Sequence, residues 1–127
     1  MKTITSNCYN RRSVTPWLIA NFHRPMYCVG DGECDFTNKY STVSRLQEEA
    51  EALFLKYHVN LVLSGHVHTY QRSFPVYNNT RTADNYESPT APVYILQGAS
   101  GNREGNKGGL PDPSTLPDWA AAQHNEV

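Results

Sequence analysis

The segment Gly65-His66-Val67-His68, which follows an apolar run at residues 59–64, constrains the fold of this chain most strongly. The apolar run is typical of a strand buried in a parallel sheet, and ligand sites in such sheets lie beyond the carboxyl ends of the strands. Two histidines one residue apart in extended backbone point to the same face. Imidazole is a good ligand for zinc, iron and manganese. The pattern therefore predicts a metal site; the alternative is a pair of histidines in a surface turn.

A second apolar stretch, residues 15–22, also ends in a histidine, His23. Pro25 follows it and would end a strand, because proline cannot donate a hydrogen bond to a neighbouring strand. Two strands that each deliver a histidine to the same edge of a sheet can assemble one site, so His23 is a third candidate ligand beside His66 and His68. Taken alone, His23 would instead be a structural residue at a strand end.

The residues between these two stretches predict a helix that is capped by Ser41 or Thr42 and runs to about Tyr57. Apolar residues at helical spacing form one face, and the charged residues, including Glu51, fall largely on the opposite, solvated face. His58 is interpreted as a residue of the helix C-terminus, where a partly cationic imidazole suits the helix dipole. The result is a β-α-β core.

Residues 70–76 and 92–97 predict two further strands, which completes an α/β fold. From Gly98 onward glycine and proline dominate, and this region predicts a loop without regular structure. Trp119 is its one large apolar residue, and we expect no further strand before the last residue. His124 belongs to no strand-end pattern.

Composition narrows the classes of function. A chain of 127 residues allows a single modest domain, and a net charge of −1 gives no reason to expect nucleic acid or an anionic membrane surface as a partner. No stretch of about 18 apolar residues exists, so no membrane span is predicted. The N-terminal residues lack the apolar centre of a signal peptide.

Five motifs occur in the order and spacing of one family. They resemble the C-terminal half of purple acid phosphatases, which are binuclear metallophosphoesterases of the calcineurin-like superfamily. The resemblance covers residues 13–119, so we divide the chain into an unmatched segment, 1–12, and a C-terminal part of a metallophosphoesterase domain, 13–127. It implies a partial β-sandwich flanked by helices. The motifs are Thr15-Pro16-Trp17-Leu18-Ile19, His23-Arg24-Pro25-Met26-Tyr27-Cys28, Gly65-His66-Val67-His68-Thr69-Tyr70-Gln71-Arg72, Phe74-Pro75-Val76-Tyr77-Asn78 and Val93-Tyr94-Ile95-Leu96-Gln97-Gly98-Ala99-Ser100-Gly101-Asn102.

The resemblance also implies roles for single residues. His23 and His66 correspond to ligands of a divalent metal, and His68 corresponds to a ligand of a ferric ion. The implied cofactor is a binuclear centre of iron with zinc, manganese or a second iron, and the implied reaction is hydrolysis of phosphomonoesters by a metal-activated water. Arg24 and Tyr70 are expected near the mouth of the site. No catalytic residue is assigned, because Arg24 could equally be a structural ion-pair partner.

Three ligand motifs of the family are absent: D-x-G, G-D-x-x-Y and G-N-H-[DE]. The segment Gly30-Asp31-Gly32-Glu33-Cys34 begins like the second but lacks its tyrosine, and we interpret it as a turn. The chain then holds three of the family's seven ligands and resembles a fragment, inactive alone and missing the N-terminal half of its domain. The alternatives are a non-catalytic metal-binding remnant, or an interaction domain that uses the surface around Tyr70 and Trp119.

Two further features bear on location. Related phosphatases often carry a cysteine pair where this chain has Cys28 and Cys34, so these residues are candidates for a disulfide. A disulfide would suit a secreted, lysosomal or vacuolar enzyme, whereas two free thiols would suit a reducing compartment. Asn78 begins the sequence Asn78-Asn79-Thr80, a glycosylation acceptor pattern in a predicted loop.

Overall fold

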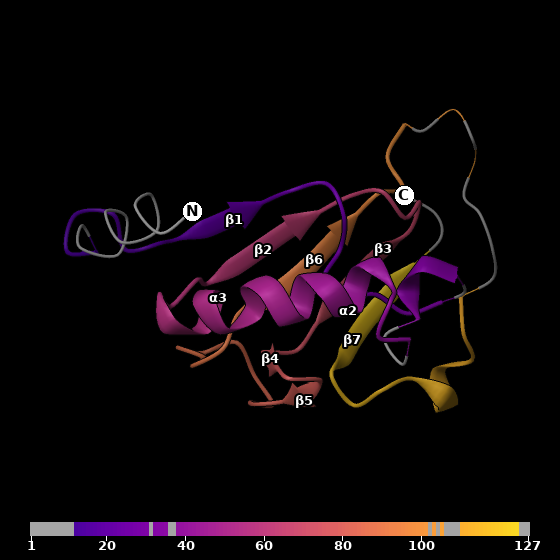
Figure 1. Cartoon of the computed structure of the whole chain (residues 1–127). Coiled ribbons are helices and arrows are strands. Elements are labelled where there is room, and N and C mark those ends of the chain that lie inside the picture. The colour runs from indigo at the N-terminus through magenta and orange to yellow at the C-terminus, as the bar shows by residue number, and fades with distance from the viewer. Residues whose placement is uncertain are drawn as a thin grey trace.

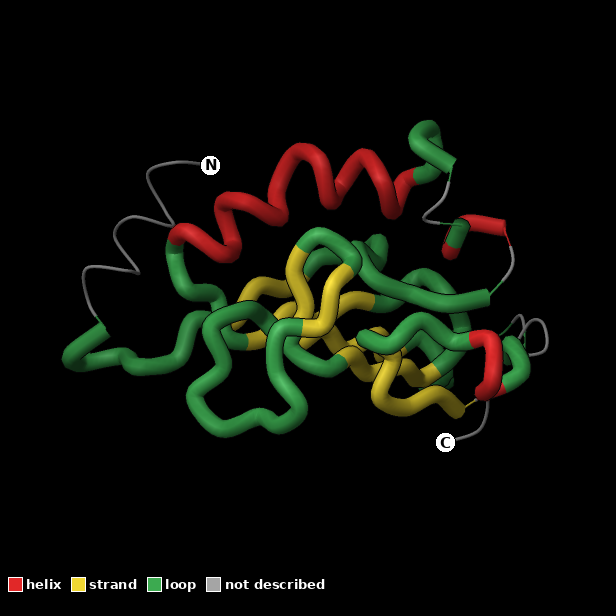
Figure 2. The backbone as a smooth tube through the Cα atoms, turned by 90° about the horizontal axis from the view of Figure 1, so that it is seen from below, coloured by secondary structure: helices red, strands yellow, loops and turns green. Residues whose placement is uncertain are grey.

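The computed structural model describes residues 12–30, 32–35, 38–101, 103, 105 and 110–124. A five-stranded sheet forms its centre, and one long helix crosses a face of that sheet (Figure 1). Seen from below, the helix forms one layer and the strands of the sheet form a second layer beside it (Figure 2). The strands of the sheet are β1 (Ile19–Asn21), β2 (Leu61–Ser64), β3 (Tyr70–Ser73), β6 (Val93–Gln97) and β7 (Ala120–His124).

The strand order in the sheet is β1-β2-β6-β3-β7. The first three strands in that order are parallel, and β3 is antiparallel to both β6 and β7. The apolar run that preceded the two histidines is therefore β2, with a parallel neighbour on each side, as predicted. The helix connects β1 to β2, which confirms the β-α-β core and the α/β class.

Strand β1 is shorter than the predicted stretch of residues 15–22. Leu18, just before the strand, pairs with Asn60 through both the backbone and the side chain: its N–H donates to Asn60 Oδ1 at 2.9 Å, and its carbonyl accepts from Asn60 N at 2.9 Å. Pro16 lies farther back and cannot donate to a ladder. The regular pairing therefore begins only at Ile19.

The helix is continuous from Thr42 to Lys56 and begins where the sequence predicted. Ser41 is its N-cap, with Oγ accepting a hydrogen bond from the N–H of Ser44 at 3.1 Å. A π-helical turn lies in its middle, which the sequence pattern did not reveal. Its three segments are α2 (Thr42–Leu46), η2 (Gln47–Glu51) and α3 (Ala52–Lys56).

The helix ends at Lys56, with Tyr57 as its C-cap, close to the predicted end at about Tyr57, and His58 follows directly, as predicted for a residue of the helix C-terminus. His58 is left-handed, with φ of 51°. Its N–H donates to the carbonyl of Leu55 at 3.0 Å, and the N–H of Val59 donates to the carbonyl of Phe54 at 2.9 Å. These two bonds form the Schellman arrangement that ends many helices, in which glycine is the usual left-handed residue. His58 is thus a helix-terminating residue.

The prediction that Glu51 lies on the solvated face is wrong. Its side chain is 6% exposed, and its Oε1 accepts hydrogen bonds from the hydroxyl of Tyr27 and, at 3.1 Å, from the N–H of Asn78. The π-helical turn adds one residue to the helical repeat, so a pattern with a period of 3.6 residues misplaces the residues at its end. The buried carboxylate is tolerated because two donors satisfy it.

The prediction that no strand follows Gly98 is also wrong. Strand β7 pairs with β3, and Tyr70 lies opposite His124 at the end of this pairing. Trp119, just before β7, is 3% exposed and packs edge-on against the ring of Tyr27 at 5.1 Å between centroids. The side chain of Trp119 therefore belongs to the core and is not itself exposed to a partner. Strand β7 is hard to recognise in the sequence because it is rich in alanine and lacks the β-branched residues that are typical of strands.

The hydrophobic core lies between the helix and the sheet. Residues from the helix, from β2 and β6 and from the segment after His23 contribute to it. No helix in the described part of the chain is long and apolar enough to cross a membrane. The buried core comprises Met26, Tyr27, Val29, Ala50, Val59, Val62, Val76, Tyr94 and Trp119.

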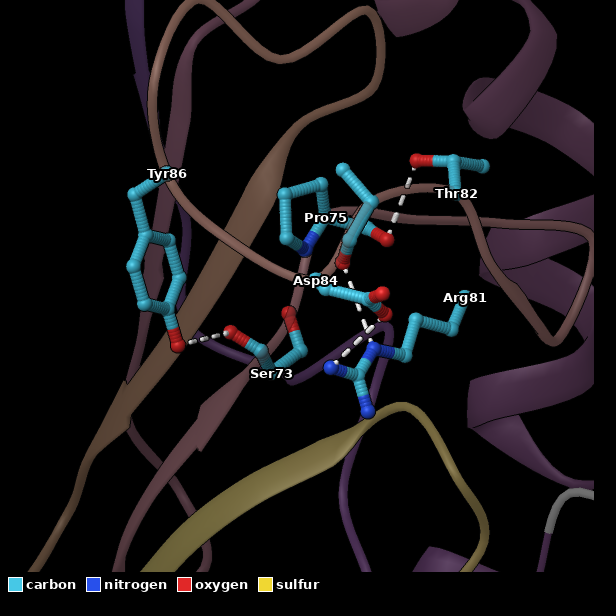
Figure 3. A network of polar contacts seen from close by, with 7 residues as sticks. Ser73, Pro75, Arg81, Thr82, Asp84 and Tyr86 are labelled. Atoms are coloured by element: carbon cyan, nitrogen blue, oxygen red, sulfur yellow. Dashed lines mark hydrogen bonds and ion pairs between the residues drawn. The ribbon is translucent and has the colours of Figure 1, made fainter.

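The predicted strand at residues 70–76 ends early, at Ser73, and the chain then forms a small hairpin of β4 (Val76–Tyr77) and β5 (Thr80–Arg81). Side-chain contacts fasten the hairpin and the loop after it to the end of β3 (Figure 3). Thr82 Oγ1 donates to the carbonyl of Pro75 at 3.0 Å, and Arg81 forms an ion pair with Asp84 at 2.9 Å. The hydroxyl of Tyr86 donates to the carbonyl of Ser73 at 3.3 Å, which holds Tyr86 beside the sheet.

Candidate metal centre

Two of the three predicted histidines meet at one edge of the sheet. His23 follows β1, and His66 follows the parallel neighbour β2. Nε2 of His23 lies 3.0 Å from Nδ1 of His66, and the two rings meet edge-on with centroids 4.9 Å apart. The N–H of Gly65 donates to the carbonyl of His23 at 3.0 Å and ties the two strand ends together. The parallel strands therefore bring together two imidazoles from distant parts of the sequence.

The backbone that carries His66 and His68 is not extended, so the expectation of an extended strand through these two histidines is wrong. β2 ends at Ser64, and the chain then bends twice, with the N–H of Val67 bonded to the carbonyl of Gly65 at 3.0 Å and that of Thr69 bonded to the carbonyl of Val67 at 2.8 Å. His66 is left-handed, with φ of 74°. A non-glycine residue in that region carries strain of about 1 kcal/mol or more, and such strain is often found at functional sites.

His68 makes a different contact from His66. Its Nδ1 lies 3.2 Å from the backbone carbonyl of Gly105. A carbonyl only accepts, so Nδ1 carries the hydrogen and the neutral ring presents Nε2 as its acceptor nitrogen. Metal-binding histidines commonly donate their other N–H to a carbonyl in this way. This contact is compatible with a ligand role for His68, but it does not bring His68 into contact with His23 or His66.

Gly98, at the end of β6, shapes the turn that carries these histidines. Its N–H donates to the carbonyl of Thr69 at 3.0 Å. A Cβ at Gly98 would lie 2.7 Å from the carbonyl carbon of Val67 and closer still to its oxygen, so only glycine fits here. A Cβ at Gly65 would meet nothing nearer than the carbonyl of His23 at 4.0 Å. The sequence pattern drew attention to Gly65 and gave Gly98 no role in the site. The signal that could have indicated Gly98 was its position directly after a predicted strand.

The contact between His23 and His66 is a hydrogen bond between two imidazole nitrogens, which lie 3.0 Å apart. Two nitrogens bound to one tetrahedral ion at about 2.1 Å lie about 3.4 Å apart, so an ion would have to replace this hydrogen bond and move the two rings slightly apart. Within the described ranges, no group of three or more histidine, cysteine, aspartate or glutamate side chains is arranged to hold a metal. The His23–His66 pair is therefore the part of the predicted site that the described residues bring together, and it has two imidazoles only.

The segment after His23 is fixed by covalent and polar contacts. Cys28 and Cys34 are joined by a disulfide with a Cα–Cα distance of 5.2 Å. Between them, Val29 is held by the buried amide of Gln71, which accepts from the N–H of Val29 at 2.7 Å and donates to its carbonyl at 2.8 Å. Asp31 lies outside the described residues. This arrangement anchors the chain that follows His23 to strand β3.

The other predicted site residues lie in varied surroundings. Arg24 and Tyr70 are half-buried, and Asn78 is exposed in the turn of the β4–β5 hairpin. Asn78 and Asn79 are both left-handed, with φ of 49° and 57°, as a tight hairpin turn requires. The asparagines of the glycosylation pattern thus have a structural role in the turn.

Comparison with known proteins identifies what the chain resembles. A family model described as calcineurin-like phosphoesterase matches residues 2–70. Acid phosphatase type 7 of Danio rerio is 38% identical over 127 residues, which cover 91% of this chain and 28% of that protein. Purple acid phosphatase 15 of Arabidopsis thaliana is 40% identical over 115 residues, covering 84% of this chain and 19% of that protein. The chain spans less than a third of the length of these relatives.

The fold has a solved counterpart. A purple acid phosphatase isolated from yellow lupin (Lupinus luteus) seeds superposes with a TM-score of 0.72 at 24% sequence identity. The superposition covers 98% of this chain and 22% of the lupin protein. The strand and helix arrangement described above is therefore part of the fold of that phosphatase.

Proposed function

Because the chain belongs to the calcineurin-like phosphoesterase family, we propose that it forms the C-terminal part of the catalytic domain of a metal-dependent acid phosphatase. The contact between His23 and His66 carries this proposal, since it brings two imidazole nitrogens from neighbouring parallel strands within 3.0 Å of each other, near the spacing of two ligands of one ion. The substrate class is phosphomonoesters, in keeping with relatives that are named acid phosphatases.

In this proposal the three histidines have separate tasks. His23 and His66 bind one divalent ion, and His68 binds a second ion, which is iron. The N–H of His68 that faces Gly105 orients its ring, and Gly98 allows the turn that carries His66 and His68 to pack against β6. When bound, the pair of ions supplies the positive charge that binds a phosphate group and activates water.

The remaining ligands belong to polypeptide outside this sequence. Two closely spaced cations repel each other, so a binuclear centre needs carboxylate ligands, and the family motifs that provide them are absent here. The same absence favours a second candidate function, a metal-binding domain that has lost catalysis. A secreted or vacuolar location of the whole protein is supported by the disulfide between Cys28 and Cys34.

Metal binding by this chain tests the proposal directly. We would titrate the chain with Co²⁺ and follow the visible absorption of the bound ion, which reports nitrogen ligands without any need for activity. His23→Ala and His66→Ala should each weaken binding at least tenfold. His58→Ala is the matched control, because His58 ends the helix and should leave the titration unchanged. Equal binding by all these variants would show that the His23–His66 pair is not a metal site.

A further inference from the structure

The turn of the β4–β5 hairpin is fixed against the helix by polar contacts. The N–H of Asn78 donates to Oε1 of Glu51 at 3.1 Å. The N–H of Asn79 donates to the hydroxyl of Tyr27 at 3.1 Å, and Oδ1 of Asn79 accepts from Nε2 of Gln47 at 3.0 Å. The hairpin therefore has a defined position beside the helix (Figure 1).

These contacts leave the side-chain amide of Asn78 available. Asn78 is exposed, and its hydrogen bonds to other described residues use its backbone N–H and its backbone carbonyl. The carbonyl accepts from Oγ1 of Thr80 at 3.3 Å, so the threonine of the acceptor pattern lies against the asparagine. The pattern occurs once in the 127 residues. A sugar joined to Nδ2 of Asn78 would break none of the contacts that hold the turn.

A cavity of about 340 Å³ adjoins the turn, between the hairpin and the helix. Its volume lies in the range of small-molecule sites, about 300–1,000 Å³. Among the described residues that line it, carboxylate, amide and hydroxyl side chains occur, but no lysine, arginine or histidine. The polar lining includes Ser44, Gln47, Glu48 and Glu51. A neutral ligand with many hydroxyl groups suits this lining, whereas an anion would be repelled by its carboxylates.

The ring of Tyr77 also lines the cavity, directly beside Asn78. Tyr77 is half-buried and lies opposite Thr80 in the register of the hairpin. Residues directly opposite each other in antiparallel strands lie on the same face. The face of an aromatic ring is negative and attracts the weakly positive C–H groups that a pyranose ring presents. A sugar attached at the turn therefore has both an aromatic surface and a polar cavity within reach.

We propose that Asn78 carries an N-linked glycan whose first N-acetylglucosamine packs on the ring of Tyr77 and over this cavity. The amide Nδ2 of Asn78 forms a bond to C1 of the sugar, the bond from C1 to the diphosphate of a lipid-linked donor breaks, and the amide proton passes to the released diphosphate. The packed sugar holds the hairpin against the helix and so stabilises the folded state. The acceptor pattern alone predicts attachment and not this stabilisation. The inference rests on the secreted or vacuolar location proposed above, but on neither metal nor catalysis.

The stability of the chain with and without one sugar tests this packing. The chain would be secreted from a eukaryotic host behind an added leader and trimmed by an endoglycosidase to one N-acetylglucosamine. Mass spectrometry should find one sugar, which is absent from Asn78→Gln. The same chain from a bacterial periplasm, where disulfides form, supplies the form without sugar. In urea unfolding, the sugar should lower the ratio of unfolded to folded chain about threefold or more, in keeping with an aromatic contact.

Tyr77→Leu is the variant that isolates the aromatic ring. It keeps an apolar side chain, so the sugar should stay attached and its effect on stability should be lost. Tyr77→Phe keeps the ring and should keep the effect. Tyr40→Leu is the matched control, because Tyr40 is 77% exposed and lies outside the cavity lining. The effect of the sugar should be the same in Tyr40→Leu as in the parent chain.

Each outcome bears on the packing of the sugar. A chain secreted without a sugar on Asn78, a sugar that leaves stability unchanged, or a sugar effect that is lost in Tyr77→Phe overturns the proposal. An equal sugar effect in Tyr77→Leu and the parent chain overturns it too, because the ring then plays no part. A sugar effect that disappears only with the ring supports the proposal, whether or not the whole protein hydrolyses phosphate. The test is therefore independent of the proposed phosphatase function.

Discussion

The backbone of Val67 occupies the space that a side chain on Gly98 would need. An added Cβ would lie 2.7 Å from the carbonyl carbon of Val67, well inside the distance of an ordinary contact. The N–H of Gly98 also donates to Thr69, so the end of β6 and the turn after β2 touch backbone to backbone. The turn that carries His66 and His68 therefore depends on a glycine that directly follows a different strand, β6.

Gly98→Ala should destabilise the chain by about 1–3 kcal/mol, the range for an added methyl group in a tightly packed place. Gly65→Ala is the matched control: its Cβ would meet nothing closer than 4.0 Å, and Gly65 has no left-handed backbone. We expect it to change stability by less than about 1 kcal/mol. Urea unfolding of the two variants measures the difference. A larger loss for Gly65→Ala than for Gly98→Ala would contradict this account of the turn.

Local patterns predicted the parts of the fold that depend on local sequence. The strand before His66, the Ser41 cap and the role of His58 were all correct, because each follows from periodicity or capping within a few residues. The parallel pairing of β1 with β2 followed from the helix between them. The meeting of His23 with His66 could be anticipated from this topology alone.

Features that depend on tertiary contacts could not be predicted in this way. Gly98 is required only because the backbone of Val67, in the turn after β2, approaches it closely. Glu51 was misplaced because a π-helical turn shifts the helical repeat and because its partners, Tyr27 and Asn78, are distant in the sequence. The bent, left-handed backbone at His66 replaced the extended geometry that a strand pattern implied.

His58→Gly should stabilise the chain by about 0.5–1 kcal/mol. His58 adopts a left-handed φ of 51° at the end of the helix, where glycine has no steric penalty. His58→Ala keeps the Cβ and its strain, so it should give no comparable gain. Thermal or urea unfolding of the two variants separates the backbone effect from loss of the imidazole. Equal stabilisation by alanine and glycine would assign the effect to the ring instead.

The buried carboxyl of Glu51 should make stability depend on pH. Burial raises the pKa of Glu51 above its usual value of 4.5, although the hydrogen bonds from Tyr27 and Asn78 oppose the rise. The folded state then holds the proton more tightly than the unfolded state does. The contribution of Glu51 to the free energy of unfolding is therefore greatest below pH 4.5, and it is lost as the pH rises through the raised pKa of the folded state.

Glu51→Gln tests this pH dependence. Glutamine keeps an oxygen that accepts from Tyr27 and Asn78 but has no titrating proton. Urea unfolding between about pH 4 and pH 7 should show a decline of stability with rising pH in the parent chain that is flattened in the variant. Glu48→Gln, at an exposed position on the same helix, should leave the decline in place. A steeper decline in Glu51→Gln would contradict the assignment.

The isolated chain should hydrolyse phosphomonoesters at a negligible rate, even when loaded with metal. In the proposed site His23 and His66 would bind a metal as neutral imidazoles, and within the described residues they form no metal-holding group with a carboxylate. Neutral ligands alone cannot hold two cations close together against their mutual repulsion. Assays with p-nitrophenyl phosphate in the presence of Fe³⁺ with Zn²⁺ or Mn²⁺ would measure the rate, and bound metal would be counted in the same samples. Turnover comparable to that of a whole acid phosphatase, sensitive to His66→Ala and insensitive to His58→Ala, would show that this chain has a complete site of its own.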